Sequence, residues 1–170
     1  MPITIDGSGS ITGGTASGQG TAVATTSGTV IELSAAIPSW VRRITVAYSG
    51  VSLSGSAHTI IQLGSGSYTT SGYASTGAYA GTGNQAGVAS ATNGLIAHGG
   101  SSTNVLTGTM TITSVSGNLW VASHSGSLSA SIGVMGGGSI TLGGTLDRIR
   151  ITTTNGTDTF DAGSINILYE

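Results

Sequence analysis

Residues 143–170, GGTLDRIRITTTNGTDTFDAGSINILYE, decide the fold of this chain. Isoleucine alternates with polar residues over 148–152, and apolar residues alternate with polar ones again over 165–170. This two-residue period is typical of strands that bury one face. Asn155-Gly156 lies between the two segments, and both residues tolerate the positive φ that tight turns require. The stretch therefore predicts a closing β-hairpin.

Charge is concentrated in the same stretch. It holds six of the ten charged residues of the chain: Asp147, Arg148, Arg150, Asp158, Asp161 and Glu170. Arg42 and Arg43 are the only positive charges outside it. We therefore expect this arginine pair to brace the fold through ion pairs, each worth about 0–1 kcal/mol if exposed and more if buried. The expected partners are Asp147, Asp158 and Asp161. Recognition of a carboxylate or phosphate by the two arginines is the alternative.

The remaining composition favours an ordered β-protein with a nearly neutral surface. Thirty of the 170 residues are glycine, charged residues make up 6%, and the mean hydropathy is +0.29. Disordered segments normally combine high net charge with few β-branched residues, whereas this chain is rich in Ile, Val and Thr. Because soluble monomers usually carry about a quarter of their surface as charged residues, we expect much of this surface to contact other copies or other proteins.

Several classes of partner are disfavoured by composition. The chain has no cysteine, so disulfides and thiolate metal sites are excluded. A net charge of -2 without any lysine disfavours nucleic acid, because phosphate binding needs a basic surface. No run approaches the roughly 18 apolar residues of a membrane span, and the N-terminus lacks the pattern of a signal peptide. We expect a protein made in the cytoplasm without membrane insertion.

Short alternating segments separated by turn residues recur along the chain. They predict about ten short strands and no helix, at 22–26, 29–33, 41–53, 57–63, 73–80, 95–98, 105–115, 119–124, 131–134, 139–142 and in the closing stretch. Strands at intervals of roughly ten residues favour an all-β fold, an antiparallel β-sandwich of jelly-roll type. A chain of this length is most simply one domain, which we place at residues 22–170.

Residues 1–21 are predicted to form an arm outside that domain. A short extended segment from Ile3 to Ile5 is followed by a Gly/Ser/Thr-rich sequence, which behaves as a flexible linker unless a partner holds it. Ile3 and Ile5 are the candidate self-association and anchoring residues, because an extended arm can add a strand to a neighbouring sheet. A disordered tail is the alternative.

Catalytic chemistry finds little support in the sequence. The spacing of His58, His98 and His124 along the chain matches no metal-binding motif. A trimer of the chain could bring one histidine from each copy together on its three-fold axis. Asp158 and Asp161 are close in sequence, but they follow a turn and are better explained as turn residues than as the acid pair of a glycosidase. We expect no enzyme activity, no catalytic residue, no cofactor and no metal.

The aromatic residues suggest a second function. Trp40 follows Ile37-Pro38, where the chain passes over a sheet edge, and is predicted to seal the rim of the core. Alternatively, exposed rings would stack on sugars. The candidate glycan contacts are Trp40, Tyr68, Tyr73, Tyr79 and Trp120. Two exposed, coplanar rings would favour this function, and burial of the rings in the core would count against it.

Three pieces of the chain share the pattern of one family. They are MPITIDGSGSITG at 1–13, IPSWVRRITVAYSGVS at 37–52 and GGGSITLGGTLDRIRITTTNGTDTFDAGSINILYE at 136–170. Together they resemble a recurrent module of tailed-bacteriophage virion proteins, described as tail-fibre or tail proteins. The resemblance implies a β-rich, oligomeric structural component on the tail or the head surface. It carries over no catalytic residue, and residues 64–104 resemble nothing specific.

One departure from that family bears on placement in the particle. Fibre proteins of this kind are often longer, with a shaft or an attachment domain before the module, whereas about 21 residues precede the domain here. This difference favours a capsid decoration or cement protein as an alternative to a tail fibre. In that role the arm would reach along a neighbouring subunit.

Three hypotheses follow. The first is a non-enzymatic phage virion protein that forms a homotrimer, contacts other capsid or tail proteins, and either binds the host surface or reinforces the particle. The second is a carbohydrate-binding module that recognises glycans of the host surface. The third is a small depolymerase acting on those glycans, which would require Asp158 and Asp161 for hydrolysis. The first hypothesis predicts localisation in the virion after synthesis in the host cytoplasm.

Overall fold

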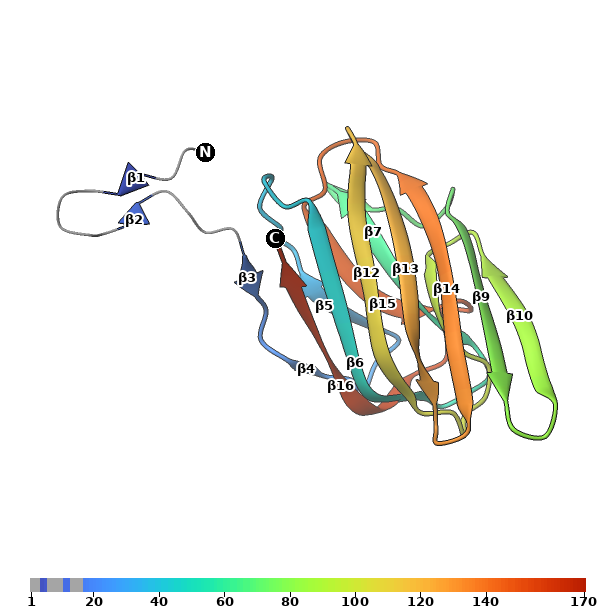
Figure 1. The fold of residues 1–170 in the computed structure, drawn as a ribbon. Helices are drawn as coiled ribbons and strands as arrows, with labels where there is room; N and C mark the ends of the chain where they lie inside the picture. Colours follow the sequence, from blue (N-terminus) through green and yellow to red (C-terminus); the bar gives the residue numbers. More distant parts are fainter. Residues whose placement is uncertain (1–3, 6–10, 13–16) are drawn as a thin grey trace.

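The computed structural model of the chain describes residues 4–5, 11–12 and 17–170 (Figure 1). Over these residues the fold is all-β, with sixteen strands and no helix, as predicted. Every pairing between strands is antiparallel. Two principal sheets pack against each other around a common core, which is consistent with the predicted β-sandwich. Its jelly-roll character stays a prediction.

The larger sheet contains the long strands. From one edge to the other, its order is β10 (Gln85–Ala91), β9 (Ala74–Gly81), β14 (Ile132–Thr141), β13 (Leu119–Leu128), β12 (Leu106–Ser116), β6 (Arg43–Leu53), β16 (Phe160–Tyr169) and β3 (Gly18–Gln19). A further two-residue strand, β4 (Val23–Ala24), also pairs with β16. Figure 1 shows β10 as the outermost strand on the side away from the C-terminus.

The smaller sheet covers one face of the larger one. Its order is β11 (Leu95–Gly99), β7 (His58–Ser65), β15 (Arg148–Thr153) and β5 (Val30–Ser34), and β8 (Ser67–Tyr68) pairs with β7. At one end of the sandwich, β11 lies against β9 and β14 of the larger sheet. This contact between the sheets is where the candidate site described below is found.

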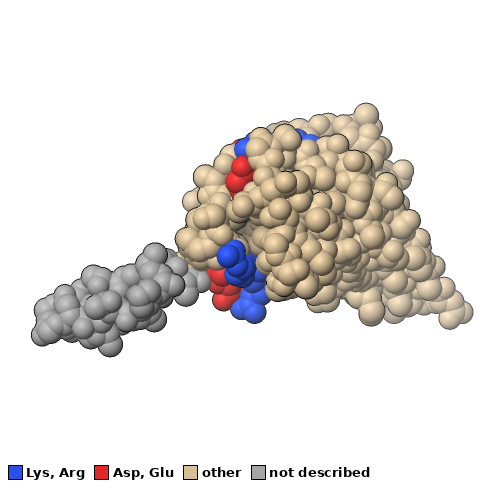
Figure 2. Space-filling model, turned by 90° about the horizontal axis from the view of Figure 1, so that it is seen from above, with Lys and Arg blue, Asp and Glu red and all other residues tan. Residues whose placement is uncertain are grey.

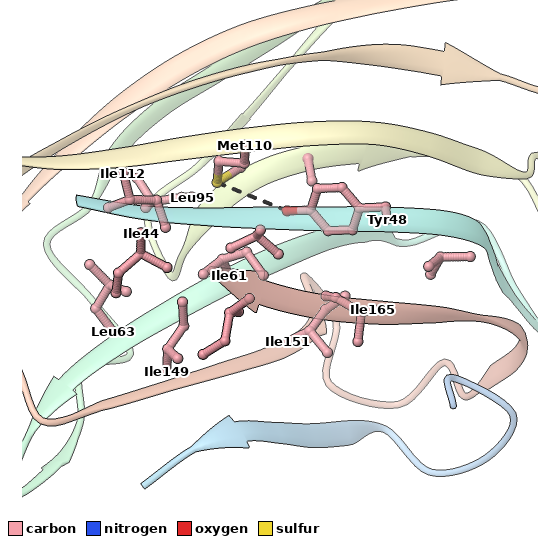
Figure 3. Close-up of a cluster of buried hydrophobic side chains, with 14 of the residues drawn as sticks. Ile44, Tyr48, Ile61, Leu63, Leu95, Met110, Ile112, Ile149, Ile151 and Ile165 are labelled. Carbon is pink, nitrogen blue, oxygen red and sulfur yellow. Dashed lines mark hydrogen bonds between the residues drawn. The ribbon is translucent and has the colours of Figure 1, made fainter. Parts of the chain in front are cut away.

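Alternation along each central strand places one face in the core. In β6, Ile44 and Val46 are 0% exposed, whereas Arg43 before them and Ala47 after them face solvent. Figure 3 shows the side chains from both sheets that meet there: Ile44, Tyr48, Ile61, Leu63, Leu95, Met110, Ile112, Ile149, Ile151 and Ile165. Burial of each such aliphatic side chain contributes about 1.5–3 kcal/mol. The packing of these residues holds the two sheets together.

The predicted closing hairpin is wrong, because its two strands belong to different sheets. β15 pairs with β7 and β5, and β16 pairs with β6, β3 and β4. The alternation is confirmed, since isoleucines of both strands are buried. Asn155 does turn the chain, because its Oδ1 accepts the amides of Thr157 and Asp158 at 3.0 and 3.1 Å. Residues 154–159, however, carry the chain across the core to the other sheet.

The strands are also longer and more numerous than predicted. β13 runs to Leu128, beyond the predicted 119–124, and the segments predicted at 131–134 and 139–142 are parts of the single strand β14. β10 was not among the predicted strands. A turn at Gly117, with a φ of +54°, joins β12 to β13 as a hairpin.

The predicted arm divides into two parts. Ile3 lies outside the described residues, and Ile5 belongs to the two-residue strand β1 (Thr4–Ile5), which pairs with β2 (Ile11–Thr12). β3 and β4 instead pair with β16. The Tyr169 ring covers Gly18, where a Cβ would lie 2.5–2.8 Å from three ring atoms. The chain from Gly18 onward is therefore part of the edge of the larger sheet.

Candidate functional site

Three histidines converge where β11 faces the larger sheet. His58 lies on β7, His98 on β11 and His124 on β13. The ring centroids of His58 and His98 are 5.0 Å apart with an interplanar angle of 82°, and the ring of Tyr79 on β9 is 5.3 Å from that of His98. Four strands from both sheets thus contribute to one cluster of rings, which we call the histidine cluster (His58, His98, His124 and Tyr79).

Two glycines make room for the histidine cluster. A Cβ at Gly77 would lie 3.0 Å from Cδ2 of His98 and 3.4 Å from Cε1 of His124, so Gly77 separates these two rings. A Cβ at Gly136 would lie 2.5 Å from Cε1 of His124 and 2.5 Å from the carbonyl oxygen of Thr76. Gly136 pairs directly with both Gly77 and His124 in the sheet. The glycines therefore allow imidazole rings to occupy the inner face at this point.

The backbone of β11 is irregular at His98. The register between β11 and β7 shifts between Ile96 and His98, and His98 has a φ of +79°. A residue other than glycine pays about 1–3 kcal/mol for such a conformation. An irregularity of this kind re-aims a side chain relative to a regular strand. Here the ring of His98 is brought into edge contact with both His58 and Tyr79.

Five of the six imidazole nitrogens of the histidine cluster are buried without a hydrogen-bond partner in the described residues. Both ring nitrogens of His98 and of His124, and Nδ1 of His58, are buried and make no hydrogen bond within the part of the chain that the structure describes. Burial lowers the pKa of His124 to about 4, and the neighbouring His98 contributes to the lowering. Burial likewise lowers the pKa of His98 and of His58. The three imidazoles are therefore neutral at neutral pH.

The geometry of these rings does not suit a metal ion. Among the described residues, no group of three or more His, Cys, Asp or Glu side chains could hold one. The rings of His58 and His98 meet edge to face, whereas ligands must direct their nitrogens at one common point. What the cluster offers chemically is hydrogen bonding by neutral imidazoles and uptake of protons in acid.

A cleft of about 560 Å³ opens beside the histidine cluster. Residues from both sheets and from three loops line it, among them Ser56, His58, Tyr79, Asn84, Gln85, His98, Asn104, Leu128 and Ile132. The lining mixes amide, hydroxyl and imidazole groups with aliphatic side chains and contains no charged residue. We call this cavity the uncharged cleft.

Unusual backbone conformations gather at the uncharged cleft. Within the described residues, only Asn84, His98 and Ser129 have a positive φ without being glycine. Asn84 and His98 line the cleft, and Ser129 follows Leu128, which also lines it. The Ser129 amide donates to the carbonyl oxygen of Val105 at 2.8 Å, which holds that loop beside Asn104. Strained residues of this kind cluster at functional sites more often than elsewhere.

Two of the five candidate glycan-contact rings are buried. Trp120 and Tyr73 are 4% and 3% exposed, so both lie in the core. Leu63 donates its amide to the Tyr73 hydroxyl at 2.8 Å, which gives that buried ring a structural role. Burial of these two rings counts against sugar stacking, because a stacking platform must be open to solvent.

The other aromatic candidates lie apart from one another. Trp40 is 42% exposed, so it seals the rim only in part, and its ring packs against Tyr169 at 51° rather than in a common plane. The guanidinium carbon of Arg150 lies 4.2 Å from the centroid of the Tyr68 ring, which is covered in this way. Tyr79 alone among the five candidates lines the uncharged cleft.

The ion pairs of the arginines differ from those predicted. Arg43 Nε donates to Oε1 of Glu170 at 2.8 Å. The reason is register, since Ile44 pairs with Tyr169 in the antiparallel ladder and brings Arg43 opposite the end of β16. Arg42 donates instead to the carbonyl oxygens of Ser39 and Val41. Both arginines are exposed, so their contribution is about 0–1 kcal/mol each.

The three aspartates proposed as partners stabilise local structure. Asp147 accepts from Nε of Arg148 at 2.7 Å, and Arg148 lowers its pKa. Asp158 accepts the Ala57 amide at 2.8 Å, which lowers its pKa as well. The Ser52 hydroxyl donates to Asp161. The positions of these carboxylates are determined by the turns and by the strand register. They are not determined by charge complementarity with Arg42 or Arg43.

Sequence reasoning missed the histidine cluster for a physical reason. The three histidines are separated by 26 residues or more, and each has small or apolar neighbours along the chain. Their convergence depends on how the two sheets pack, which local periodicity does not specify. One signal was present in the sequence, namely the run of glycines at 136–138, because close approach of side chains to a strand often requires glycine.

Comparisons with known proteins found nothing similar. No family model, no curated protein and no solved structure matches the chain. The part of the chain that the structure describes contains no helix long and apolar enough to cross a membrane.

Proposed function

We propose that this chain is a non-enzymatic structural protein of a bacteriophage particle, which self-associates as a trimer and is mounted on the tail or on the head surface. The resemblance of residues 37–52 and 136–170 to virion modules supports the phage assignment. The antiparallel sandwich is compatible with the β-rich structural component that the resemblance implies. Other virion proteins of the capsid or tail are its expected neighbours.

The absence of charge over most of the larger sheet carries the proposal. No charged residue occurs between Arg43 and Asp147 in the sequence. This interval contains five neighbouring strands of the larger sheet, namely β12, β13, β14, β9 and β10. Their half of the sheet therefore has no charged residue on either face. In the view of Figure 2, charged residues gather in two small groups and the rest of the visible surface is uncharged. Depletion of charge is typical of the buried centre of protein interfaces.

Side chains on the outer face of this half are small and aligned across strands. One row, defined by the register of the ladders, runs from Ala47 through Thr109, Ser125, Met135 and Ala78 to Val88. Met135 is 64% exposed and Val88 is 74% exposed. We call the outer side of β12, β13, β14, β9 and β10 the neutral face. A second copy is its favoured occupant, because two neutral faces meet without repulsion between like charges.

The carboxylates support the non-enzymatic part of the proposal. Each one in residues 17–170 accepts a hydrogen bond that stabilises local structure: Glu32 from Tyr68, Asp147 from Arg148, Asp158 from Ala57, Asp161 from Ser52 and Glu170 from Arg43. A glycosidase needs two carboxyl groups facing one substrate across a cleft. Carboxylates committed to strands and turns in this way do not favour a depolymerase.

Location in the particle tests the proposal directly. Cryo-electron microscopy of the phage that encodes the chain should show density for the sandwich in three copies about one axis. Density on the capsid lattice would establish a decoration or cement role, and density at the distal tail would establish a role in host attachment. Particles in which neither mass spectrometry nor density reveals the chain would overturn the proposal.

A further inference from the structure

The uncharged cleft has the properties of a small-molecule site. Its volume of about 560 Å³ falls within the roughly 300–1,000 Å³ of ligand pockets in proteins. It contains hydrogen-bonding groups together with an aromatic ring and aliphatic side chains. Its lining includes His98, which is 1% exposed and whose ring nitrogens make no hydrogen bond of regular geometry in the described residues, although the backbone of Gly77 and Gly99 acts on the ring and raises its pKa. Buried polar groups of this kind normally have a partner.

The chemistry of the lining restricts the ligand. A charged ligand would lose its hydration without gaining a counter-charge, because no charged residue lines the cleft. A purely apolar ligand would leave the amides, hydroxyls and imidazoles of the lining without hydrogen bonds, which costs about 1–3 kcal/mol for each buried group. A neutral ligand with many hydroxyl groups and an apolar face avoids both costs.

We propose that the uncharged cleft is a binding site for a neutral saccharide. Tyr79 supplies the aromatic surface, since its ring rests against Gly87 on the neighbouring strand and against the edge of His98. A Cβ at Gly87 would come within 2.5–2.7 Å of three atoms of that ring, so the glycine is what allows the ring to lie flat over β10. Apolar faces of sugar rings stack on aromatic surfaces of this kind.

The amides of the cleft are placed to bind hydroxyl groups. Asn84 and Gln85 lie at the turn between β9 and β10, and both are exposed to solvent. Asn104 is held on the opposite side, because its Nδ2 donates to the carbonyl oxygen of Gly99 at 2.8 Å. His58 completes this side with its imidazole. Donors and acceptors therefore face the cavity from the β9–β10 turn and from the loop after β11.

This site differs from the aromatic platform considered from the sequence. It uses a single ring in a concavity, and it excludes Trp40, Tyr68, Tyr73 and Trp120. It can also be tested apart from the proposed place in a particle, because binding is measured on the isolated chain. Failure of saccharide binding would leave the virion proposal intact, and failure of the virion proposal would leave the cleft unaffected.

Titration of the full chain, labelled with ¹⁵N, tests the proposal by nuclear magnetic resonance. The probes are D-glucose, D-galactose, N-acetyl-D-glucosamine, lactose and cellobiose, with glucose 6-phosphate and N-acetylneuraminic acid as charged comparators. At least one neutral probe should cause saturable shifts of the amides of residues 84–88 and 98–104, and should bind at least tenfold more tightly than the charged comparators. No saturable shift with any neutral probe, or shifts confined to another surface, would overturn the proposal.

Matched variants assign the binding to the cleft. Tyr79→Ala should weaken binding of the neutral probe at least tenfold, whereas Trp40→Ala, which removes an exposed ring outside the cleft, should leave it unchanged. Gln85→Ala alters an exposed side chain at no risk to folding and should weaken binding about threefold or more. The site would be refuted if both variants, Gln85→Ala and Tyr79→Ala, bound the neutral probe as tightly as the unmodified chain does.

Discussion

At Gly136 the backbone of β14 passes so close to His124 that no side chain fits. An added Cβ would lie 2.5 Å from the imidazole and from a backbone oxygen of β9, and 2.7 Å from Cα of Gly77. We therefore predict that Gly136→Ala lowers the free energy of unfolding by about 1–3 kcal/mol through overpacking. Gly133→Ala is the control on the same strand, because its nearest atom would be 3.8 Å away. The measurement is urea denaturation of both variants. The free energy of unfolding of the Gly133→Ala variant should stay within about 0.5 kcal/mol of that of the unmodified chain, and that of the Gly136→Ala variant should not.

The lowered pKa of His124 predicts that the folded chain loses stability in mild acid. Its pKa is about 4 in the folded chain and about 6.5 when unfolded, so the unfolded state binds the proton first. Stability is then unaffected above pH 6.5 and decreases as the pH falls from 6.5 to 4, by about 3 kcal/mol at about 1.4 kcal/mol per pH unit. The ionisable neighbour that acts on His124 is the imidazole of His98, which lowers its pKa further and does not stabilise the imidazolium as a carboxylate would.

The measurement is the free energy of unfolding in urea between pH 7 and pH 4. Replacement of His124 by Gln removes the titrating group, so the pH dependence of that variant should be clearly shallower. Asp147 and Asp158 have lowered pKa values, and their stabilising contribution is lost only below about pH 3.8, outside this window. Identical slopes for the variant and the unmodified chain would mean that His124 is not buried as described.

On the scale of elements, the contact of β4 with β16 depends on a buried threonine. Thr25 is 0% exposed, its hydroxyl donates to the carbonyl oxygen of Ala162 at 2.7 Å, and its amide donates to Gly163 at 2.9 Å. Thr25→Val keeps the shape but leaves that carbonyl without its hydroxyl partner, so we predict a loss of about 1–2 kcal/mol. Thr26→Val at the exposed neighbouring position should be neutral. Thermal unfolding followed by circular dichroism compares the two, and an equal effect would contradict a specific role for Thr25.

Strand identity was predictable at this scale, but strand partnership was not. The alternation of β6, β12, β15 and β16 identifies their buried faces correctly, because burial of one face imposes a period of two on the sequence. Whether Asn155 leads into a hairpin or into the opposite sheet is decided by long-range packing. The histidine cluster and the uncharged cleft were missed for the same reason, since both combine strands of the two sheets.

For the molecule as a whole, the distribution of charge separates two kinds of surface. Arg43 with Glu170 lies where β6 begins and β16 ends, and Asp147 with Arg148 lies at the start of β15. The neutral face lies on strands that contain no charged residue. A monomer gains nothing from such a division, because charge on a free surface favours solubility. Oligomers that bury the neutral face gain stability from it, since no charge needs to be desolvated.

A single charged residue introduced into the neutral face tests whether copies of the chain contact each other there, and the oligomeric state is the readout. Met135 is 64% exposed near the middle of the neutral face, and Met135→Arg should convert the predicted trimer to monomer, because a guanidinium would be buried at the interface without a partner. Thr157→Arg places the same charge on the exposed loop between β15 and β16 and should leave the trimer intact. Light scattering after size exclusion measures both masses, and circular dichroism confirms folding. A trimer that persists in the Met135→Arg variant would exclude the neutral face as the contact between copies.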